Sequence, residues 1–232
     1  MARKKLSSLK PLTDSEPVRN AARALIAAVR DELENRGLPP DTYAKAIRDI
    51  GRLRGRPLLY PMLSASHGQG AWVLLANGTR KLDFISGIGP HGFGHSDDDL
   101  LETAVAYAAT DVPFQGHLLP GPEYLHLTRA LLRHAGANLK HAWLSLSGTM
   151  ANENALKLIF QKHAPADRIV VFENCFHGRS LASAEMSDRP GFREGQPLRG
   201  NVLQVPFYDP SREDSIEHSV SALDAHLQRY PG

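Results

Sequence analysis

The sequence has little cysteine, no long apolar run and almost no net charge, and each absence excludes a class of protein. Cys175 is the single cysteine among 232 residues, which excludes an intrachain disulfide and fits a reducing compartment. No stretch approaches the roughly 20 consecutive apolar residues of a membrane-spanning helix, and the basic start at residues 1–5 lacks the apolar run of a signal peptide after it. Lysine plus arginine number 27 against 25 acidic residues, so no concentrated basic surface indicates nucleic acid as a partner. We therefore expect a cytoplasmic protein that binds neither membranes nor nucleic acid.

The composition is that of a globular protein, because 42% of the residues are hydrophobic and 22% are charged. The length of 232 residues corresponds to one large or two modest domains. About the first fifteen residues lack periodicity and are expected to form a mobile tail. A helix is expected from about Pro17, where apolar residues recur at helical spacing. Residues 41–57 are basic and are interpreted either as a solvated surface segment or as an interaction arm.

The middle of the chain changes from helical to extended character and back. Residues 71–75 and 82–85 are predicted as short strands joined by a tight turn at Asn77-Gly78. Four glycines fall within residues 87–95, a density that predicts an irregular loop. Helical spacing returns after Asp97.

The second half alternates between short apolar segments and helical patterns, which predicts an α/β fold with a parallel sheet. The expected strands are 142–146, 169–172 and 202–205, and the expected helices are 150–163 and 216–230.

A candidate phosphate site lies where the first of these strands meets the following helix. Ser147 and Thr149 offer hydroxyl groups, and Gly148 lets a ligand approach backbone amides that have no partner within the helix. The alternative is that Ser147 or Thr149 only caps the helix. The glycine patterns of P-loops and of dinucleotide-binding folds are absent.

A second candidate segment, residues 175–180, follows the next strand. Because successive parallel strands end at the same edge of a sheet, both loops are expected to face one crevice. Phe176 could stack on a planar ring and His177 could form hydrogen bonds, although each by itself is as well explained as an ordinary structural residue.

At these residues the sequence resembles class III, fold-type I aminotransferases that depend on pyridoxal 5′-phosphate (PLP), the group that includes acetylornithine, ornithine and 4-aminobutyrate aminotransferases. The similarity runs from about residue 70 to the end, with matching motifs at 83–89, 94–96, 147–157 and 176–179. It implies an α/β, fold-type I PLP-transferase-like chain made of the N-terminal segment and the first part of the mainly parallel-sheet large domain. The expected parts are 1–69 (tail, helix and basic segment), 70–95 (small strands and glycine-rich loop) and 96–232 (an incomplete PLP-binding domain).

The resemblance also implies roles for individual residues. The cofactor-binding residues would be Ser147, Gly148, Thr149, Phe176 and His177, with Gly148 and Thr149 on the phosphate, Phe176 against the pyridine ring and His177 as a positioning group. Met150 stands where the family frequently has glutamate.

Three further residues, Ser86, Gly87 and Gly89, would help to form the wall of the substrate entrance. The implied substrates are an amino donor and a 2-oxo acid, and the full-length form would be a homodimer.

Two residues that the family's chemistry needs, the Schiff-base lysine and the aspartate at the pyridine nitrogen, belong to later elements that do not occur in this sequence. We therefore expect no catalytic residue within the chain and no activity from it alone; Lys157, inside the predicted helix, is not expected to take the lysine's place. The alternative functions are a non-catalytic truncated or split-gene product that acts by binding another subunit, and a small phosphate-binding domain unrelated to PLP. His91 and His95 are not expected to hold a metal, because the intervening glycines disfavour a helix.

Overall fold

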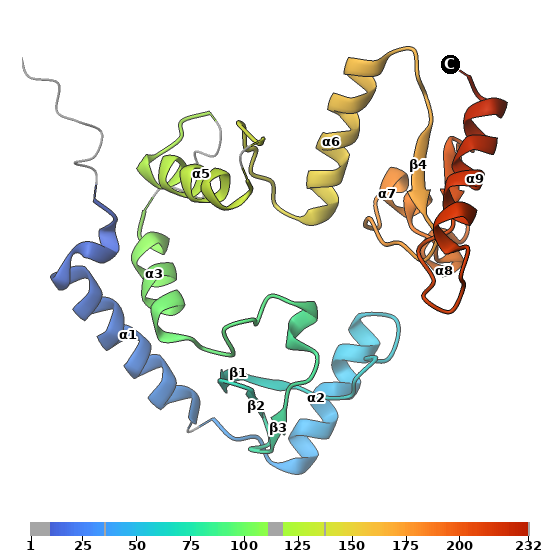
Figure 1. Ribbon diagram of the computed structural model, residues 1–232. Coiled ribbons are helices and arrows are strands. Elements are labelled where there is room, and N and C mark those ends of the chain that lie inside the picture. Colours follow the sequence, from blue (N-terminus) through green and yellow to red (C-terminus); the bar gives the residue numbers. More distant parts are fainter. Residues whose placement is uncertain (1–9, 35, 111–117, 137, 232) are drawn as a thin grey trace, which may run out of the picture. The chain divides into compact units, whose positions relative to one another are not determined.

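The computed structural model describes residues 10–34, 36–110, 118–136 and 138–231. It divides into two compact units, residues 1–137 and 138–232 (Figure 1). The three-part division expected from the family resemblance stays a prediction. Most of the expected mobile tail, residues 1–9, lies outside the described residues.

The first unit contains two short 3-10 turns, four α-helices and three strands among its described residues. In chain order these are η2 (Leu12–Asp14), α1 (Glu16–Glu34), α2 (Pro40–Leu53), β1 (Ser64–Gln69), β2 (Trp72–Leu75), β3 (Arg80–Leu82), η3 (Ser86–Ile88), α3 (Asp98–Ala108) and α5 (Pro122–His134). The helix expected from about Pro17 is α1, and the basic segment forms α2, which the sequence pattern did not predict. Pro40 suits the first turn of α2 because proline lacks the amide that would be unpaired there.

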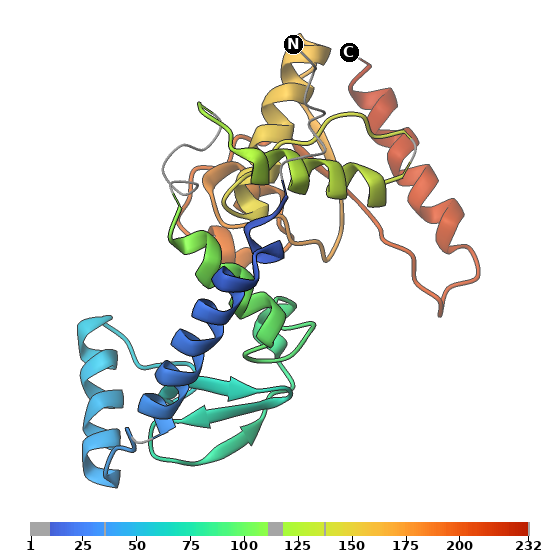
Figure 2. The ribbon, with the colours of Figure 1, turned by 90° about the vertical axis from the view of Figure 1, so that its left-hand side faces the viewer.

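Helix α1 packs against α3, and a buried charge ties the two helices together (Figure 2). Glu102 of α3 is only 5% exposed and accepts hydrogen bonds from the guanidinium groups of Arg19 and Arg23 on α1. These bonds, that from Arg23 first, hold the pKa of Glu102 below its ordinary value. The amide of Leu12 also donates to the hydroxyl of Tyr107, so part of the expected tail is fixed on α3.

The three strands form an antiparallel sheet in the order β1-β2-β3. The predicted turn is present at Asn77-Gly78, where Gly78 has φ +82° and the Asn77 side chain accepts from the amide of Thr79. Strand β1 was not predicted. The prediction that the second strand extends to residue 85 is wrong, because the Asp83 carboxylate captures the amides of the next turn and ends β3 at Leu82.

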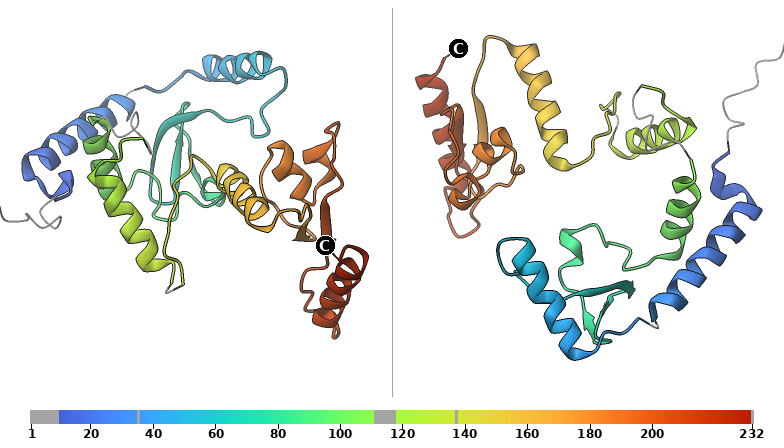
Figure 3. Two further views of the ribbon diagram at one scale, coloured as in Figure 1. Left: turned by 90° about the horizontal axis from the view of Figure 1, so that it is seen from above. Right: turned by 180° about the vertical axis from the view of Figure 1, so that it is seen from behind.

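The second unit holds a parallel strand pair with helices around it. Its elements are α6 (Gly148–His163), β4 (Ile169–Phe172), α7 (Leu181–Met186), α8 (Pro190–Arg193), β5 (Val202–Val205) and α9 (Ser215–Arg229). The parallel register, with Ile169 opposite Val202, confirms the prediction of parallel strands. Helix α9 lies beside β5 (Figure 3), and Val171 and Val205 are buried in the strand pair.

The predicted strand at 142–146 is wrong: this segment has no regular structure. A strand requires a hydrogen-bonded neighbour, which apolar composition alone does not supply. The side chains of Trp143 and Leu146 are 65% and 102% exposed, so the apolar pattern of this segment does not mark a buried strand in this unit. The short helices α7 and α8 were not predicted either. Among the residues that the structure describes, no helix combines the length and apolarity needed to cross a membrane.

Candidate functional site

The turn that opens α6 presents a cluster of hydrogen-bond donors. Ser147 is the N-cap, and its hydroxyl accepts from the amide of Met150 at 3.2 Å. The amide of Ala151 donates to the Ser147 carbonyl at 2.9 Å and begins the helical pattern. The amides of Gly148 and Thr149, which lie between Ser147 and Met150, donate to no acceptor in the described part of the chain. They lie at the positive end of a helix of 16 residues, where an anion is stabilised.

Space in front of this turn is open. A Cβ atom built on Gly148 would meet no heavy atom within 4 Å, so a ligand can reach the backbone there. Ser147 therefore performs the capping role that the sequence left as an alternative, and the cap leaves the two preceding donors available. Unpaired amides beside a hydroxyl are the donor set that a phosphate group requires.

The loop 175–180 packs directly on this turn, although the strand expected before the turn is absent. The side-chain amide of Asn152 on α6 donates to the carbonyl of His177 at 2.8 Å, and the Ser180 hydroxyl bonds the carboxylate of Glu153. Gly178 is buried with φ +129°, and a Cβ built on it would lie 2.4 Å from Oγ1 of Thr149. Only glycine therefore allows this close approach of loop and helix.

A fully buried serine holds the other side of the same loop. The hydroxyl of Ser187, 0% exposed, accepts from the amide of His177 at 3.0 Å and lies 3.2 Å from the carbonyl of Gly178. It is also 2.9 Å from the carbonyl of Ser183, its donor target on α7. The backbone of His177 is thus fixed on both sides, by Asn152 and by Ser187. Neither support was predicted from the sequence: Asn152 lies within the motif at 147–157, whereas nothing local marks Ser187.

Phe176 presents its ring to solvent. The side chain is 60% exposed and meets Phe192 edge to face, with ring centroids 5.5 Å apart at 72°. Because more than half of the Phe176 side chain remains exposed, a planar group can still approach its ring. The five predicted cofactor residues, Ser147, Gly148, Thr149, Phe176 and His177, therefore all belong to the two packed loops of the second unit.

An aspartate fixes the start of this loop to the strand pair. Asp188 accepts from the amide of Asn174 at 2.8 Å and from the side chain of Gln204 on β5 at 3.1 Å. These bonds, the first above all, lower the pKa of Asp188. The loop is thereby tied both to α6 and to β5.

The three predicted substrate-entrance residues lie in the first unit, in the irregular loop that the glycine density predicted. Ser86, Gly87 and Gly89 have φ values of +49°, +59° and +107°. The ends of this loop meet at a close pair: Oδ2 of Asp83 lies 2.7 Å from Nε2 of His95. The pKa of Asp83 is lowered by the His95 hydrogen bond first and by backbone donors second.

The contact between Asp83 and His95 was not predicted from the sequence, because the two residues lie twelve positions apart. The His91 ring also packs on the His95 ring, with centroids 4.2 Å apart. Even so, within the described ranges no three histidine, cysteine or acidic side chains are placed to hold a metal ion.

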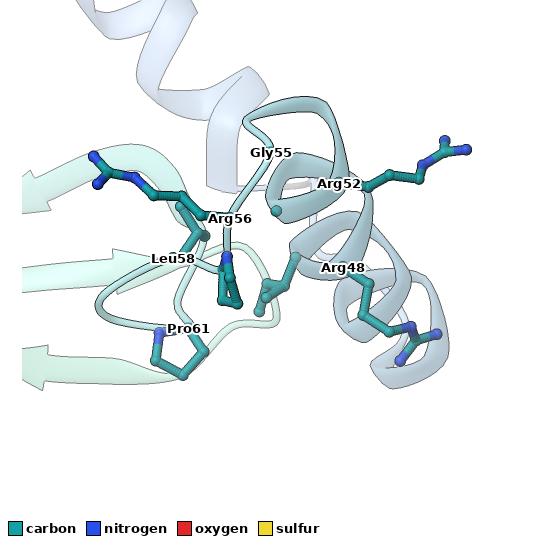
Figure 4. A pocket seen from close by; sticks show the side chains of 9 residues that line it. Arg48, Arg52, Gly55, Arg56, Leu58 and Pro61 are labelled. Atoms are coloured by element: carbon teal, nitrogen blue, oxygen red, sulfur yellow. The ribbon is translucent and has the colours of Figure 1, made fainter.

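A separate cavity of about 490 Å³ lies beside α2, in the basic segment (Figure 4). Ile47, Pro57, Leu58 and Pro61 give it an apolar lining. The charged ends of the arginines on α2 extend away from residues 57–61 in Figure 4. This cavity therefore has no convergent polar groups of the kind that the second unit provides.

The profile of the aminotransferase class-III family matches residues 56–230 of this chain. Acetylornithine aminotransferase of Xanthomonas campestris is 36% identical over 157 residues, which cover 64% of this chain and 38% of that protein. The probable mitochondrial acetylornithine aminotransferase of Schizosaccharomyces pombe is 31% identical over 173 residues, covering 70% of this chain and 38% of that protein. The chain thus spans well under half the length of these relatives.

Solved structures give the same fold. A Bacillus anthracis aminotransferase superposes with a TM-score of 0.68 at 20% identity, covering 83% of this chain and 46% of that chain. A thermostable (S)-enantioselective omega-transaminase from Thermomicrobium roseum gives a TM-score of 0.68 at 21% identity, covering 80% and 46%. These likenesses confirm the expected transaminase-like α/β fold.

Proposed function

Because this chain belongs to the class III aminotransferase family, we propose that it forms part of an enzyme that moves an amino group from an amino acid or amine to a 2-oxo acid. Class III aminotransferases depend on PLP. The observation that carries the proposal is the pair of amides at Gly148 and Thr149 that find no acceptor among the described residues, packed against the loop that bears Phe176 and His177. Family membership also replaces the weaker reading of a phosphate-binding domain unrelated to PLP.

The residues present fit the phosphate group of PLP. The amides of Gly148 and Thr149 and the Thr149 hydroxyl would donate to it, and the dipole of α6 would stabilise its charge. Ser147 would contribute chiefly by holding the amide of Met150, which keeps the turn in its donor geometry. When bound, PLP supplies an electron sink for reactions at the substrate carbon.

The second loop would orient the rest of the cofactor. The exposed Phe176 ring would lie against the pyridine ring, which aromatic side chains bind face to face. His177, whose backbone is fixed by Asn152 and Ser187, would position the ring rather than act as a base. In the first unit, Ser86, Gly87 and Gly89 would form part of the wall of the substrate entrance.

We propose further that this chain does not transaminate alone. Lys157 is exposed on α6, nine residues after Gly148, which corresponds to about 13 Å along a helix axis. That distance is too great for it to reach a ring whose phosphate lies at the helix start. The active form would be a cytoplasmic homodimer of longer chains.

A second candidate function is a non-catalytic product that acts by binding another subunit. The exposed apolar side chains favour it: Leu146, Leu118 and Ile88 are 102%, 97% and 92% exposed. Exposed apolar side chains mark a surface that packs against further protein where they form a contiguous patch.

Binding of pyridoxamine 5′-phosphate, which cannot react with lysine side chains, tests the proposed site. We expect the chain to bind it at least tenfold more tightly than pyridoxamine, which lacks the phosphate. Gly148→Ala should remove most of that preference because its methyl group occupies the open approach to the amides. Gly191→Ala is the matched control, since a Cβ there also meets nothing within 4 Å but lies in α8.

Equal affinity for the two compounds, measured by calorimetry, would contradict the phosphate site. Transamination by the purified 232-residue chain would contradict the proposal that it is inactive alone. A single stable complex with a longer aminotransferase chain, without any gain of activity, would favour the second candidate.

A further inference from the structure

The loop between β3 and α3 closes on itself through a ring of side-chain and backbone contacts. Oδ1 of Asp83 accepts from the amides of Ile85 and Ser86 at 2.8 and 3.0 Å. A Cβ built on Gly87 would lie 2.9 Å from the His91 ring, so the turn packs on that histidine. His91 packs in turn on His95, at a centroid distance of 4.2 Å.

The ring is completed by a single side-chain pair. Nε2 of His95 lies 2.7 Å from Oδ2 of Asp83, and these side chains are only 16% and 14% exposed. Asp83 therefore uses one carboxylate oxygen for the start of the loop and the other for its end. A charge-assisted hydrogen bond shielded from water is stronger than an exposed one.

Both ends of the loop are hydrogen-bonded to the turn that joins β1 and β2, at Gly70 and Ala71. The amide of Asp83 donates to the carbonyl of Ala71 at 2.9 Å. At the other end, His95 and Gly70 exchange backbone hydrogen bonds of 2.7 and 3.1 Å. A Cβ on Gly94 would lie 2.9 Å from the Gly70 backbone, so this approach also requires glycine. The β1–β2 turn therefore fixes the backbone at both ends of the loop, and the Asp83–His95 pair links the two ends through their side chains.

Within the loop, four consecutive residues hold positive φ values, Ser86, Gly87, Ile88 and Gly89. Left-handed conformations cost free energy for Ser86 and Ile88, which carry side chains, and persist only where the surroundings enforce them. The contact ring supplies that enforcement.

From this geometry we propose that Asp83 and His95 are a positioning pair that holds the Ser86–Gly89 turn in its left-handed conformation. The pair acts through the turn. Its significance for substrate binding rests on the proposed function, because that function places Ser86, Gly87 and Gly89 at the substrate entrance. The pair itself does not depend on that function.

Amide hydrogen exchange of the chain without ligand tests the pair. Asp83→Asn keeps an oxygen that can accept from Ile85 and Ser86 but removes the charge that faces His95. We expect exchange at the distant amides of Gly89 and His91, which both donate to the Ser86 carbonyl, to accelerate roughly tenfold.

His95→Gln should produce the same acceleration, and the double variant should add nothing to either single change. Asp97→Asn is the matched control, because Asp97 caps α3 by accepting from Leu100 and lies outside the contact ring. Additive effects, or no change at Gly89 and His91 in Asp83→Asn, would overturn the proposal.

A spectroscopic signature separates positioning from general stability. With Asp83 as acceptor, neutral His95 must carry its proton on Nε2, which long-range ¹H–¹⁵N spectra report directly. We expect this tautomer in the wild-type chain and a mixture of the two tautomers in Asp83→Asn. The Nδ1-protonated tautomer in the wild type would refute the pair. Since no cofactor is present, a failure of the pair is distinct from a failure of the phosphate site.

Discussion

The loop after β3 and the turn before α6 both combine glycine with hydroxyl side chains, yet they use their backbone amides differently. In the first unit the amides of Ile85, Ser86, Gly89 and His91 all donate within the loop. At the start of α6 the amides of Gly148 and Thr149 have no acceptor in the described chain. A loop whose amides donate to its own acceptors can form the wall of a site but offers no donors to a ligand. Unpaired amides at a helix N-terminus, in contrast, attract an anion.

The two regions also differ in what joins their distant segments. A charged pair, Asp83 and His95, closes the first loop. In the second, neutral groups fix the backbone of His177, the amide of Asn152 and the hydroxyl of Ser187, while the carboxylates of Glu153 and Asp188 accept only from neutral donors. None of these groups accepts from the amides of Gly148 and Thr149, so the positive end of the α6 dipole keeps two donors for a bound anion.

The largest effect is expected at the glycine contact of the second unit. Gly178→Ala forces a methyl group toward Thr149 and strains a backbone at φ +129°, so the free energy of unfolding should fall by about 2–4 kcal/mol. Urea denaturation followed by circular dichroism measures this loss. Gly191→Ala, with open space around its Cβ, should change stability by less than about 0.5 kcal/mol. Equal losses of stability in both variants would show that the close contact between Gly178 and Thr149 does not stabilise the second unit.

The helix cap should contribute less. Ser147→Ala removes the acceptor for the amide of Met150 and should lower the free energy of unfolding by about 1 kcal/mol. Ser221→Ala, an exposed change inside α9, should leave stability unchanged or raise it slightly. If thermal melts show the two serines to be equivalent, the α6 turn is not held by its cap.

The charged pair of the first unit should reveal itself through pH. Because hydrogen bonds lower the pKa of Asp83 in the folded chain, its ionised form stabilises the fold above the unfolded pKa, about 4, and this contribution is lost as pH falls through the folded pKa. The stability difference between wild type and Asp83→Asn should therefore stay constant from about pH 7 to pH 5 and shrink below about pH 4. Denaturant titrations at pH 6 and pH 3 measure it. A difference that persists unchanged at pH 3 would show that the charge of Asp83 is unimportant.

The smallest effect on stability is expected at Gly148, where the turn before α6 faces open space. Gly148→Ala adds a methyl group in free space at the first position of a helix, so the free energy of unfolding should change by less than about 0.5 kcal/mol. The same variant is expected to lose the preference for a phosphorylated ligand. A large loss of stability would mean that Gly148 serves the fold rather than ligand approach.

Several elements and the candidate site follow from local sequence patterns. Helix α1, the Asn77-Gly78 turn and the parallel strands β4 and β5 were predicted because periodicity, turn residues and β-branched runs are local properties. The cap at Ser147 and the open approach at Gly148 were also readable, since they depend on only a few consecutive residues.

Where the local patterns failed, the missing information was non-local. Residues 142–146 have the composition of a strand, but composition does not specify a hydrogen-bonding neighbour. Strand β3 ends early because Asp83 bonds the amides that follow it, and that carboxylate is held in turn by His95, twelve positions away. Helix α2 was not predicted because the interpretation of its segment rested on the positive charge, and charge indicates exposure to solvent but not backbone conformation.

By itself, the sequence determined helix α1, the Asn77-Gly78 turn, strands β4 and β5, the resemblance to class III aminotransferases and the residues of the candidate phosphate turn, because each depends on neighbouring side chains. Only the tertiary structure decided which distant groups meet: Ser187 and Asn152 on His177, Gly178 on Thr149, and His95 on Asp83. These contacts join segments separated by 10 to 29 positions, and their partners are selected by packing and by the need to satisfy buried polar groups.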